Sequence, residues 1–429
     1  MKALKLGLII VAAASVTIGL SGMAYAFHSG GVADCDGCHS MHAPKTGGTA
    51  LLQGTDYSST CLNCHASATT GSYHVMTYPY TAAGVPPVDY NPGGDFAWLQ
   101  KTYTYAGHGG TVTENGQDHG HNVVAADFGM TADTNYTTSP GGTFVSTNLA
   151  CNSCHDPHGK YRRIGGDTTY TIGTTGAPII GSGSYATSLV PTATQAVGSY
   201  RLLAGQNYSQ NAGTLPISYP GVPIASAPSS YSQAETTAIT QVRVAYGVGT
   251  VAGSTTWGQW CATCHGTFHS TGNYVHPIDT ALSATIAANY GAYVSSGIMT
   301  GTASSSYLSL VPFATNSSDY TVLKPLASNN GSALGGPGTS DQVNCLSCHR
   351  AHASGFTSML RWDMNLEFIT EAVSGVAAYP GTDNGFTSGS TNQGRTSTEW
   401  QAAYYGRPAT YFNAGGYQRV LCNKCHAQD

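Results

Sequence analysis

Apolar and polar residues follow a regular period in only a few stretches of the chain. Residues 279–294 fit the period of a helix, with Tyr290 on the apolar face and Asp279 as the N-terminal cap. Residues 397–405 form a second predicted helix, with Glu399 in its first turn. Most of the remaining chain is Gly, Ser, Thr, Asn and Pro without sustained periodicity. The pattern predicts a mostly irregular fold with few short helices and minimal strand.

The N-terminus has the pattern of a secretory signal peptide. Two lysines precede an apolar run from Leu6 to Leu20, and Ala24-Tyr25-Ala26 forms a small-x-small cleavage site. The alternative is a membrane anchor, but the run is short for a bilayer span. We therefore expect residues 1–26 to be removed and residues 27–429 to form one exported unit.

The composition is unusual for a folded chain. Charged residues make up 9% and glycine numbers 54, against about 25% charged residues and about 7% glycine in typical chains. Disordered chains combine high net charge with few aromatic residues, but this chain has a net charge of −5 and 27 tyrosines. Such a chain needs a core that is not built from helices and strands. The acidic balance gives no support for nucleic-acid binding.

One short pattern, Cys-x-x-Cys-His, recurs six times and uses all 12 cysteines. Numbered in chain order, the six boxes consist of Cys35, Cys38 and His39; Cys61, Cys64 and His65; Cys151, Cys154 and His155; Cys261, Cys264 and His265; Cys345, Cys348 and His349; and Cys422, Cys425 and His426. In such a box the two thiols form thioethers to haem and the histidine binds the iron. A single box also fits a redox or zinc site, but six that leave no other cysteine indicate a hexahaem c-type cytochrome.

Six covalently attached haems c supply the missing core, because each is a large apolar disc tied to the backbone at two points. Irregular backbone wrapped around them is then expected. Residues 168–232, the stretch poorest in charge, would be a very long linker. Tyrosines spread through that stretch indicate instead that it packs over the haems.

The histidine supply fits six irons with two histidine ligands each. Of 16 histidines, six lie in the boxes. The ten others, for each of which a surface residue or a haem-propionate partner is the alternative, are His28, His42, His74, His108, His119, His121, His158, His269, His276 and His352. Usable methionines are few, so we expect histidine as the second axial ligand throughout.

Three spare histidines, His42, His158 and His352, follow a box histidine by three residues, and His269 follows one by four. On a helical turn such residues share a face. The box histidine lies under its own haem, so its neighbour cannot reach the other side of the same iron. Each pair is expected to serve two haems packed side by side; the alternative is contact with propionates.

Basic residues are few and lie near two of the boxes. Lys160, Arg162 and Arg163 follow the third box, and Arg350 and Arg361 bracket the fifth. Arginine suits carboxylates because its planar fork donates two parallel hydrogen bonds. We expect these residues to bind haem propionates, with ordinary surface cations as the alternative.

The chain resembles the filament-forming hexahaem outer-membrane c-type cytochromes of metal-reducing bacteria over essentially its whole mature length. Beyond the boxes, the resemblance is carried by the stretches Phe27–Gly31, Pro92–Phe96, His155–Arg163, Arg243–Gly247, Asp319–Lys324, Cys345–Phe356 and Tyr417–Ala427. The boxes alone would indicate only a multihaem cytochrome; the stretches between them make the resemblance specific.

The resemblance implies a loop-dominated subunit whose six haems form one continuous chain. It further implies head-to-tail polymerisation, in which His42 of one subunit completes the haem on His349 of its neighbour. It favours as second ligands His42, His74, His121, His158, His276 and His352, keeps His28 and His269 as further candidates, and assigns no role to His108 or His119. Electrons would pass from upstream outer-membrane or periplasmic cytochromes along a secreted, cell-surface filament to acceptors such as metal oxides or electrodes.

Two other functions compete with a conducting filament. A multihaem oxyanion reductase needs an iron with an open axial site, often with lysine in place of the box histidine, whereas every box here ends in histidine. A monomeric periplasmic or surface electron shuttle has the same boxes and differs only in not forming filaments.

Overall fold

The computed structural model describes residues 35–45, 51–67, 73–229, 232–237, 240–269, 276–295, 297–330 and 334–426. The predicted leader and His28 lie outside these ranges. Within them, no helix is both long and apolar enough to cross a membrane.

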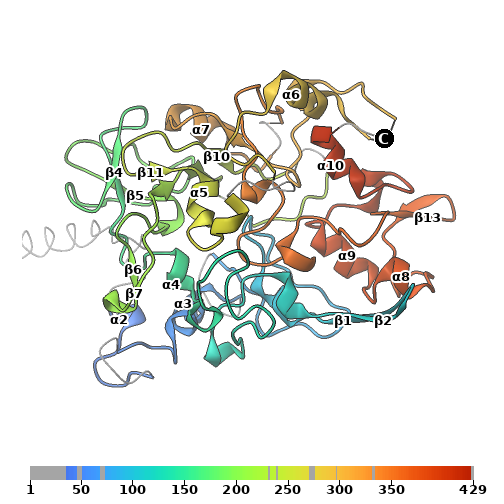
Figure 1. Cartoon of the computed structure of the whole chain (residues 1–429), viewed down its shortest axis with the longest axis horizontal. Helices are drawn as coiled ribbons and strands as arrows, with labels where there is room; N and C mark the ends of the chain where they lie inside the picture. The colour runs from blue at the N-terminus through green and yellow to red at the C-terminus, as the bar shows by residue number, and fades with distance from the viewer. Residues whose placement is uncertain are drawn as a thin grey trace, which may run out of the picture.

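Loops that connect short helices and strands make up most of the described chain (Figure 1). The α-helices are α2 (Cys35–Cys38), α3 (Tyr57–His65), α4 (Cys151–Cys154), α5 (Trp257–Ala262), α6 (Ser283–Ala292), α7 (Tyr320–Leu326), α8 (Gly389–Asn392), α9 (Ser397–Ala403) and α10 (Arg419–His426). The 3₁₀-helices are η2 (Phe96–Gln100), η3 (Gly116–His119), η4 (Ala126–Phe128), η5 (Ser146–Asn148), η6 (Tyr200–Leu202), η7 (Asn211–Gly213), η8 (Gly266–His269), η9 (Ala303–Ser305), η10 (Cys345–Ser347), η11 (Thr357–Met359) and η12 (Ala409–Phe412). The predicted irregular fold is confirmed.

The strands of the described residues form small sheets of two or three strands. Their bounds are β1 (Tyr103–Gly107), β2 (Gly110–Glu114), β3 (Arg162–Ile164), β4 (Thr171–Gly173), β5 (Val197–Gly198), β6 (Ser209–Gln210), β7 (Leu215–Pro216), β8 (Val222–Pro223), β9 (Ala225–Ser226), β10 (Ala245–Gly247), β11 (Ser254–Thr255), β12 (Ala314–Thr315), β13 (Glu371–Val373) and β14 (Val376–Ala378). The hairpins β1–β2, β6–β7 and β13–β14 are antiparallel, β8 and β11 are parallel, and the three-stranded sheets have the orders β4-β3-β5 and β12-β10-β9.

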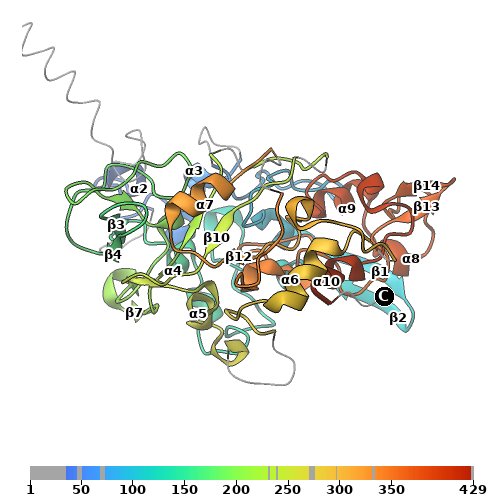
Figure 2. The same cartoon turned by 90° about the horizontal axis from the view of Figure 1, so that it is seen from above.

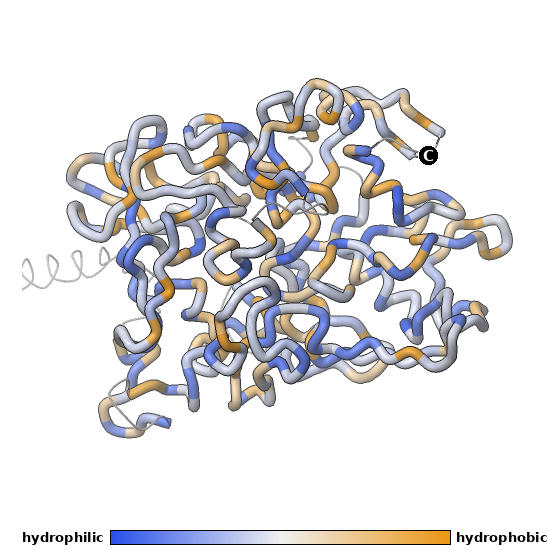
Figure 3. The backbone as a smooth tube through the Cα atoms, in the orientation of Figure 1, coloured by the Kyte–Doolittle hydropathy of each residue, from blue (hydrophilic) through white to orange (hydrophobic). Residues whose placement is uncertain are grey.

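The elements that carry the boxes are distributed along the long axis of the molecule (Figures 1 and 2). The helix α2, with the first box, lies near one end. The helices α3, α4 and α5 lie nearer the middle, and α10, with the sixth box, lies in the opposite half, where it packs against α6. Apolar and polar residues are interspersed along the whole tube in Figure 3. No single apolar layer organises the fold.

The first predicted helix is present as α6, which buries Tyr290, but its predicted cap is wrong. The backbone of Asp279 is left-handed, with a φ of 62°. Its carboxylate accepts hydrogen bonds from the Thr256 hydroxyl (2.6 Å) and the Gly258 N–H (3.3 Å). Asp279 therefore supports the start of α5, the helix of the fourth box, and not the helix that follows it in the chain.

The second predicted helix is present as α9. Thr396 is its cap, and Glu399 completes a capping box by accepting the Thr396 N–H at 2.9 Å. The helix carries Trp400, whose side chain is fully buried and lies nearly parallel to the ring of Tyr404. Glu399 lies in the first turn, as expected, but the cap is Thr396 and not Ser397 or Thr398, the residues with which the sequence predicts the helix to open.

Residues 168–232 are ordered where the structure describes them and pack over the third box. Their buried tyrosines are Tyr170, Tyr200, Tyr208 and Tyr219. The hydroxyl of Tyr208 donates to the Asn152 carbonyl and that of Tyr219 to the Ser153 carbonyl, each at 2.6 Å. The stretch is therefore a cover for the third box and not a linker, as its tyrosines predicted.

A buried ionic network joins segments far apart in the chain. Glu114, at the end of β2, accepts hydrogen bonds from His119 Nε2 (2.7 Å) and from the Arg395 guanidinium. All three residues are at most 5% exposed. Burial opposes ionisation of Glu114, but Arg395 and His119 outweigh it and lower the pKa of the carboxyl from 4.5 to about 2. We call these three residues the Glu114 network.

The Glu114 network is expected to make the free energy of unfolding depend on pH in acid. The unfolded chain protonates Glu114 near pH 4.5 and the folded chain only near pH 2. The contribution is therefore fully present above pH 4.5 and is lost as the pH falls towards 2, by about 3 kcal/mol. Glu114→Gln should unfold more easily at pH 7 by about 3 kcal/mol, because Arg395 is left unpaired, and should lose less stability in acid.

Urea unfolding followed by far-UV circular dichroism, at neutral pH and at stepwise lower pH, measures both effects. Glu367→Gln, a change at an exposed carboxylate, serves as the control. An acid slope in Glu114→Gln equal to that of the unaltered protein would contradict the prediction.

Candidate haem-binding sites

Each box places its two thiols and its histidine on one turn of chain. In four boxes the N–H of the histidine donates to the carbonyl of the first cysteine at 2.8 to 3.1 Å; these histidines are His39, His155, His265 and His349. Residues at positions i, i+3 and i+4 share a helical face. None of the 12 cysteines forms a disulfide. The arrangement presents three reactive groups of each box to the same side.

Polar caps fix where two of these turns begin. Asp56 accepts the Ser59 N–H at 2.7 Å at the start of α3, the helix of the second box. Thr256 accepts the Gln259 N–H at 3.2 Å at the start of α5, the helix of the fourth box. A side-chain oxygen that satisfies a free N–H of the first turn stabilises a helix start by about 1 kcal/mol.

Backbone carbonyls hold four box histidines in one orientation. The Nδ1 atom lies 2.7 to 2.8 Å from a carbonyl oxygen, in the pairs His65–Tyr73, His155–Arg201, His265–Pro140 and His349–Ser358. A carbonyl only accepts, so Nδ1 carries the proton and Nε2 presents its lone pair. That tautomer is the one an iron ligand bound through Nε2 requires.

Four box histidines face a spare histidine at the separation that a shared metal imposes. The ring centroids lie 6.4 Å apart in His39–His158, 6.1 Å in His265–His121, 6.4 Å in His155–His352 and 6.3 Å in His426–His276. Two imidazoles bonded through Nε2 to one metal, at about 2.0 Å each, have centroids roughly 6 Å apart. We call these four the facing pairs. Each has the geometry of two axial ligands on opposite sides of one iron.

The expectation that a box histidine and its third neighbour share a helical face is wrong. The helical turn ends at the box histidine, and the chain continues extended: His155 has φ −105° and ψ 136°. Two such neighbours nevertheless lie beside a box other than their own, the position that a ligand of a different haem would need. His158, after the third box, faces the first box, and His352, after the fifth box, faces the third.

Two of the spare histidines are held as firmly as the box histidines. The Nδ1 atom of His121 lies 2.8 Å from the Ala351 carbonyl, and that of His352 lies 3.3 Å from the Gly94 carbonyl. Burial lowers the pKa of His121 to about 4 and that of His352 to about 3. Both rings are therefore neutral at physiological pH, the state that binds a metal.

Of the other spare histidines, His42, His74, His108 and His119 have no facing box histidine among the described residues. His42 and His108 are exposed, His42 in the loop after the first box and His108 in the turn between β1 and β2, and His269 is the last residue of η8. For the same part of the chain, no histidine ring faces His349 of the fifth box. That box therefore has one ligand position for which its own described chain offers no candidate.

His74 and His119 differ in whether a ring nitrogen is available. His74 is half-buried, and its Nε2 is buried without a hydrogen-bond partner, which suits a ligand. His119 is fully buried, with Nδ1 3.0 Å from the Trp98 carbonyl and Nε2 2.7 Å from Glu114. Because oxygen acceptors occupy both of its nitrogens, His119 has none to offer to iron.

Successive boxes lie beside one another in chain order. The side chains of Cys61 and Cys151 lie close enough to shift each other's pKa, as do those of Cys261 and Cys345. The other neighbouring thiols are close enough to shift one another's pKa, in the pairs Cys38–Cys64, Cys154–Cys264 and Cys348–Cys422. Attachment points from the first box to the sixth thus form one unbroken series.

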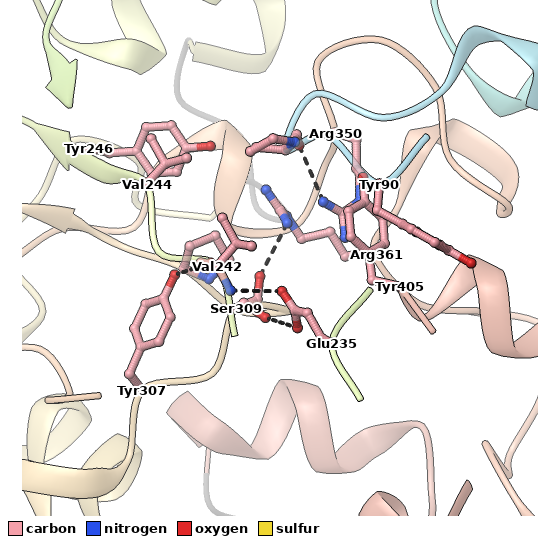
Figure 4. Close-up of a pocket in the computed structure, with 12 residues that line it drawn as sticks. Tyr90, Glu235, Val242, Val244, Tyr246, Tyr307, Ser309, Arg350, Arg361 and Tyr405 are labelled. Atoms are coloured by element: carbon pink, nitrogen blue, oxygen red, sulfur yellow. Dashed lines mark hydrogen bonds between the residues drawn. The ribbon is translucent and has the colours of Figure 1, made fainter. Parts of the chain in front are cut away.

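A pocket next to the fifth box is rich in positive charge and tyrosine (Figure 4). Its lining includes Arg350, Arg361, Tyr246, Tyr307, Tyr405 and Glu235. Both arginines are almost fully buried, and within the described residues neither forms an ion pair with a carboxylate. Glu235 does not neutralise them, because its carboxylate already binds Arg407, Ser309 and the Val242 N–H. We call this site the arginine pocket.

One arginine of the pocket has an unused donor. The guanidinium of Arg350 lies 3.4 Å from the centroid of the Tyr405 ring, and its Nε is buried without a partner. Burial lowers the pKa of Arg350 to about 9. Arg361 donates to the backbone carbonyls of Leu346 (2.8 Å) and Ser309 (3.2 Å). A buried cation without a counter-charge is costly, so the pocket is suited to an added carboxylate.

Arg163 differs from these two. It forms an ion pair with Asp167 at 2.8 Å and lies over the ring of Tyr320. The expectation that the basic residues near the third and fifth boxes bind propionates therefore has its best geometric support at the fifth box. The tyrosines and Glu235 of the pocket carry no local motif, so sequence reasoning did not find them.

Together these residues fit covalently bound haem and do not fit a zinc site. Paired thiols, a box histidine with Nε2 free and a facing imidazole are the donors that a c-type haem uses. In the described part of the chain, no three residues among His, Cys, Asp and Glu gather to hold a metal ion on their own.

No protein-family model matches the chain. The C-type cytochrome OmcS of Geobacter sulfurreducens is 47% identical to it over 451 aligned residues, which cover 100% of both chains. Two solved structures, the OmcS nanowires by cryo-EM and the outer membrane cytochrome S filament, both from Geobacter sulfurreducens, match with a TM-score of 0.84. They are 47% and 46% identical and cover 94% of this chain and 100% of theirs. With its six boxes and this full-length identity, the chain belongs to the OmcS family of c-type cytochromes.

Proposed function

We propose that the protein is an extracellular electron carrier whose subunits, each with six covalently bound haems c, join head to tail into a conducting filament. The observation that carries this proposal is a regular spacing between each spare histidine and the box that it faces. We call this spacing, counted in boxes along the chain, a step. The similar proteins support the proposal, because OmcS is a c-type cytochrome and its solved structures are nanowires and a filament.

The first of two such steps relates the odd-numbered boxes. His352, after the fifth box, faces His155 of the third, and His158, after the third box, faces His39 of the first. Each of these spare histidines thus serves the box two places earlier. Applied once more, the step assigns His42, after the first box, to a box two places before it. In a head-to-tail polymer that is the fifth box of the neighbouring subunit.

The second step serves the even-numbered boxes. His121 precedes the third box and faces His265 of the fourth, and His276 precedes the fifth box and faces His426 of the sixth. The same step assigns His28, which precedes the first box, to His65 of the second.

His74 is the other candidate for the iron of the second box, because its Nε2 is buried and unpartnered. His28 is favoured because Tyr73, directly before His74, already accepts from Nδ1 of His65, on the side away from the iron. His269 has no place in either step, and we do not include it among the proposed ligands.

Exposure and position both support the assignment of His42. Its side chain is exposed, whereas the fifth box has no facing histidine in the part of the chain described by the structure. The first box lies near one end of the molecule (Figure 1). A heterologous contact of this kind does not close on itself, and it produces an open filament.

When bound, haem supplies an iron centre that exchanges one electron. The chain's own residues orient the imidazoles and keep successive boxes adjacent. An enzyme would need an open axial position, whereas here the facing pairs supply two imidazoles to each of four boxes. This geometry supports a carrier over an oxyanion reductase.

The compartment and the partners belong to the same proposal. We propose that residues 1–26 are cleaved during export and that residues 27–429 act as one unit at the cell surface. Upstream outer-membrane or periplasmic cytochromes would donate electrons, and metal oxides or electrodes would accept them. A monomeric shuttle differs in one respect that can be tested, the absence of filaments.

The arginine pocket is proposed to bind a haem propionate. A carboxylate there would neutralise the buried charge of Arg350 and Arg361 and accept the unused Arg350 Nε–H. The tyrosines and prolines that line the pocket exclude water and strengthen this electrostatic contact.

The ligand assignment predicts the outcome of His158→Ala. The change should leave six haems attached, because all 12 cysteines and six box histidines remain, but should open one axial position at the first box. In filaments, one iron in six should become high-spin and bind added imidazole; in separated subunits this iron should appear in addition to that of the fifth box, which then lacks the neighbour's His42. Intact mass, electron paramagnetic resonance and an imidazole titration measure this. If all irons remain low-spin, His158 is not the ligand that faces His39.

The arginine pocket predicts a change in one reduction potential. Arg350→Gln removes a positive charge that disfavours the more positive ferric state, so one of the six midpoint potentials should fall. The expected shift is on the order of 60 mV, equivalent to about 1.4 kcal/mol. Arg350→Lys keeps the charge, so its six midpoint potentials should lie close to those of the unaltered protein. Spectroelectrochemical titration measures the six potentials, and six unchanged values in Arg350→Gln would contradict the proposal.

The step between odd boxes predicts that His42→Ala disrupts assembly. Subunits should fold and carry six haems, because His42 lies outside every box. Filaments should shorten or disappear, and one iron in six should become high-spin, because the fifth box of the neighbour loses its second imidazole. Electron microscopy and paramagnetic resonance measure the two effects, with His108→Ala as the exposed-histidine control. Normal filaments with all irons low-spin would show that His42 is not the bridge.

A further inference from the structure

The one spare histidine among the described residues with both ring nitrogens bonded to oxygen acceptors lies next to two proposed iron ligands. His119 belongs to the Glu114 network, and His121 lies two residues after it. The neighbouring segment of chain carries His352. Any role of His119 near these ligands rests on the proposed function, in which His352 binds the iron of the third box and His121 that of the fourth.

The two ligand-bearing segments are bonded directly to each other. The His121 N–H donates to the His352 carbonyl at 2.9 Å, and the Ser354 N–H donates to the His119 carbonyl at 3.0 Å. The ring of His121 is oriented by the Ala351 carbonyl at 2.8 Å. We call residues 119–121 with residues 351–354 the ligand ribbon. A displacement of either segment would move both ligands, His121 and His352.

The close approach of the two segments depends on glycine. A Cβ at Gly120 would lie 2.4 Å from the His352 carbonyl oxygen, and a Cβ at Gly94 would lie 1.7 Å from the Ala353 carbonyl oxygen. Both distances are far below van der Waals contact. Ala353 is therefore enclosed between two backbone segments, and the ribbon has one available position.

The Glu114 network anchors this ribbon at both of its segments. The His119 ring is fixed by Glu114 (2.7 Å) on one side and the Trp98 carbonyl (3.0 Å) on the other. Arg395 binds Glu114 and also donates to the Gly355 carbonyl at 2.9 Å, directly after the ribbon. A continuous path of hydrogen bonds thus runs from Gly355 through Arg395 and Glu114 to His119.

Charge makes this anchor specific. Only 9% of the residues in the chain are charged, yet Glu114 and Arg395 are both almost fully buried here. Charged hydrogen bonds are short and directional, so they hold a ring orientation more strictly than apolar packing would. A neutral apolar cluster of the same size would fill the space without fixing His119.

We infer that His119 is a positioning residue, which through its bond to Glu114 sets the ligand ribbon and with it the axial histidines of the third and fourth boxes. It does not touch an iron. Its loss should alter the two facing pairs His155–His352 and His265–His121 together. The pairs His39–His158 and His426–His276 belong to other segments and should not respond.

Two substitutions of similar size separate the two bonds of the ring. In His119→Asn the amide nitrogen takes roughly the place of Nδ1, so the bond to Trp98 is kept and the bond to Glu114 is lost. In His119→Gln it takes roughly the place of Nε2, so the bond to Glu114 is kept. His108→Ala, a change at an exposed histidine, is the control.

The experiment is electron paramagnetic resonance of the oxidised six-haem protein, with intact mass to confirm haem content. In His119→Asn we expect two of the six low-spin signals to shift or turn high-spin, and four to stay. His119→Gln and His108→Ala should match the unaltered protein. Six unchanged signals in His119→Asn, equal effects of Asn and Gln, or changes spread over all six irons would overturn the inference. So would a His119→Asn protein that fails to accumulate with six haems.

Two further variants separate this inference from the ligand assignment itself. His121→Ala and His352→Ala should each open one iron, at the fourth and third boxes respectively. If neither does, the assignment of these ligands fails and the inference fails with it. If both do while His119→Asn changes nothing, the ligands are correct and only the positioning role of His119 is wrong.

Discussion

The rest of the structure depends on one constraint. Imidazole rings face each other in pairs, at the separation that two ligands of one iron require. Four box histidines face spare histidines 6.1 to 6.4 Å away. In each pair the two rings come from segments that follow or precede different boxes. If these pairs bind iron as we propose, ligation ties together parts of the chain that hydrogen-bonded sheets or long helices would join in other proteins. The backbone is free to be irregular because these cross-links fix its course.

The few polar interactions inside the molecule act on the same parts. Carbonyl oxygens orient the rings of His65, His155, His265 and His349. The Glu114 network holds the ribbon that carries two spare ligands, and the arginine pocket adjoins the fifth box. In a chain so poor in charge, buried ions lie where a ring or a haem edge has to be held in one orientation. A buried charge favours one conformation over similar alternative conformations more strongly than apolar packing does.

Regular exchange of ligands also explains how one subunit leads to a polymer. The step from the fifth box to the third and from the third to the first is the same in direction and length along the series. For the histidine that follows the first box, the same step requires a second subunit, because no odd-numbered box precedes the first one. The proposed filament therefore repeats, between subunits, the same pairing of histidines that is present within one subunit.

The sequence by itself determined the chemistry and the class of fold. Six boxes that use every cysteine indicate covalent haem, and the lack of periodicity indicates loops around it. The same chain also predicted that His158 and His352 turn to boxes other than their own. Local signals sufficed where the physics is local, as for the acidic first turn of α9. The tertiary structure alone decided which histidine faces which iron position, because that depends on where the chain goes after each box. The tertiary structure also placed Asp279 at the start of α5 instead of at the predicted helix. It placed His119 beside Glu114, which binds Arg395. The contacts of Asp279 with Thr256 and of Glu114 with Arg395 join residues far apart in sequence, and no local pattern records them.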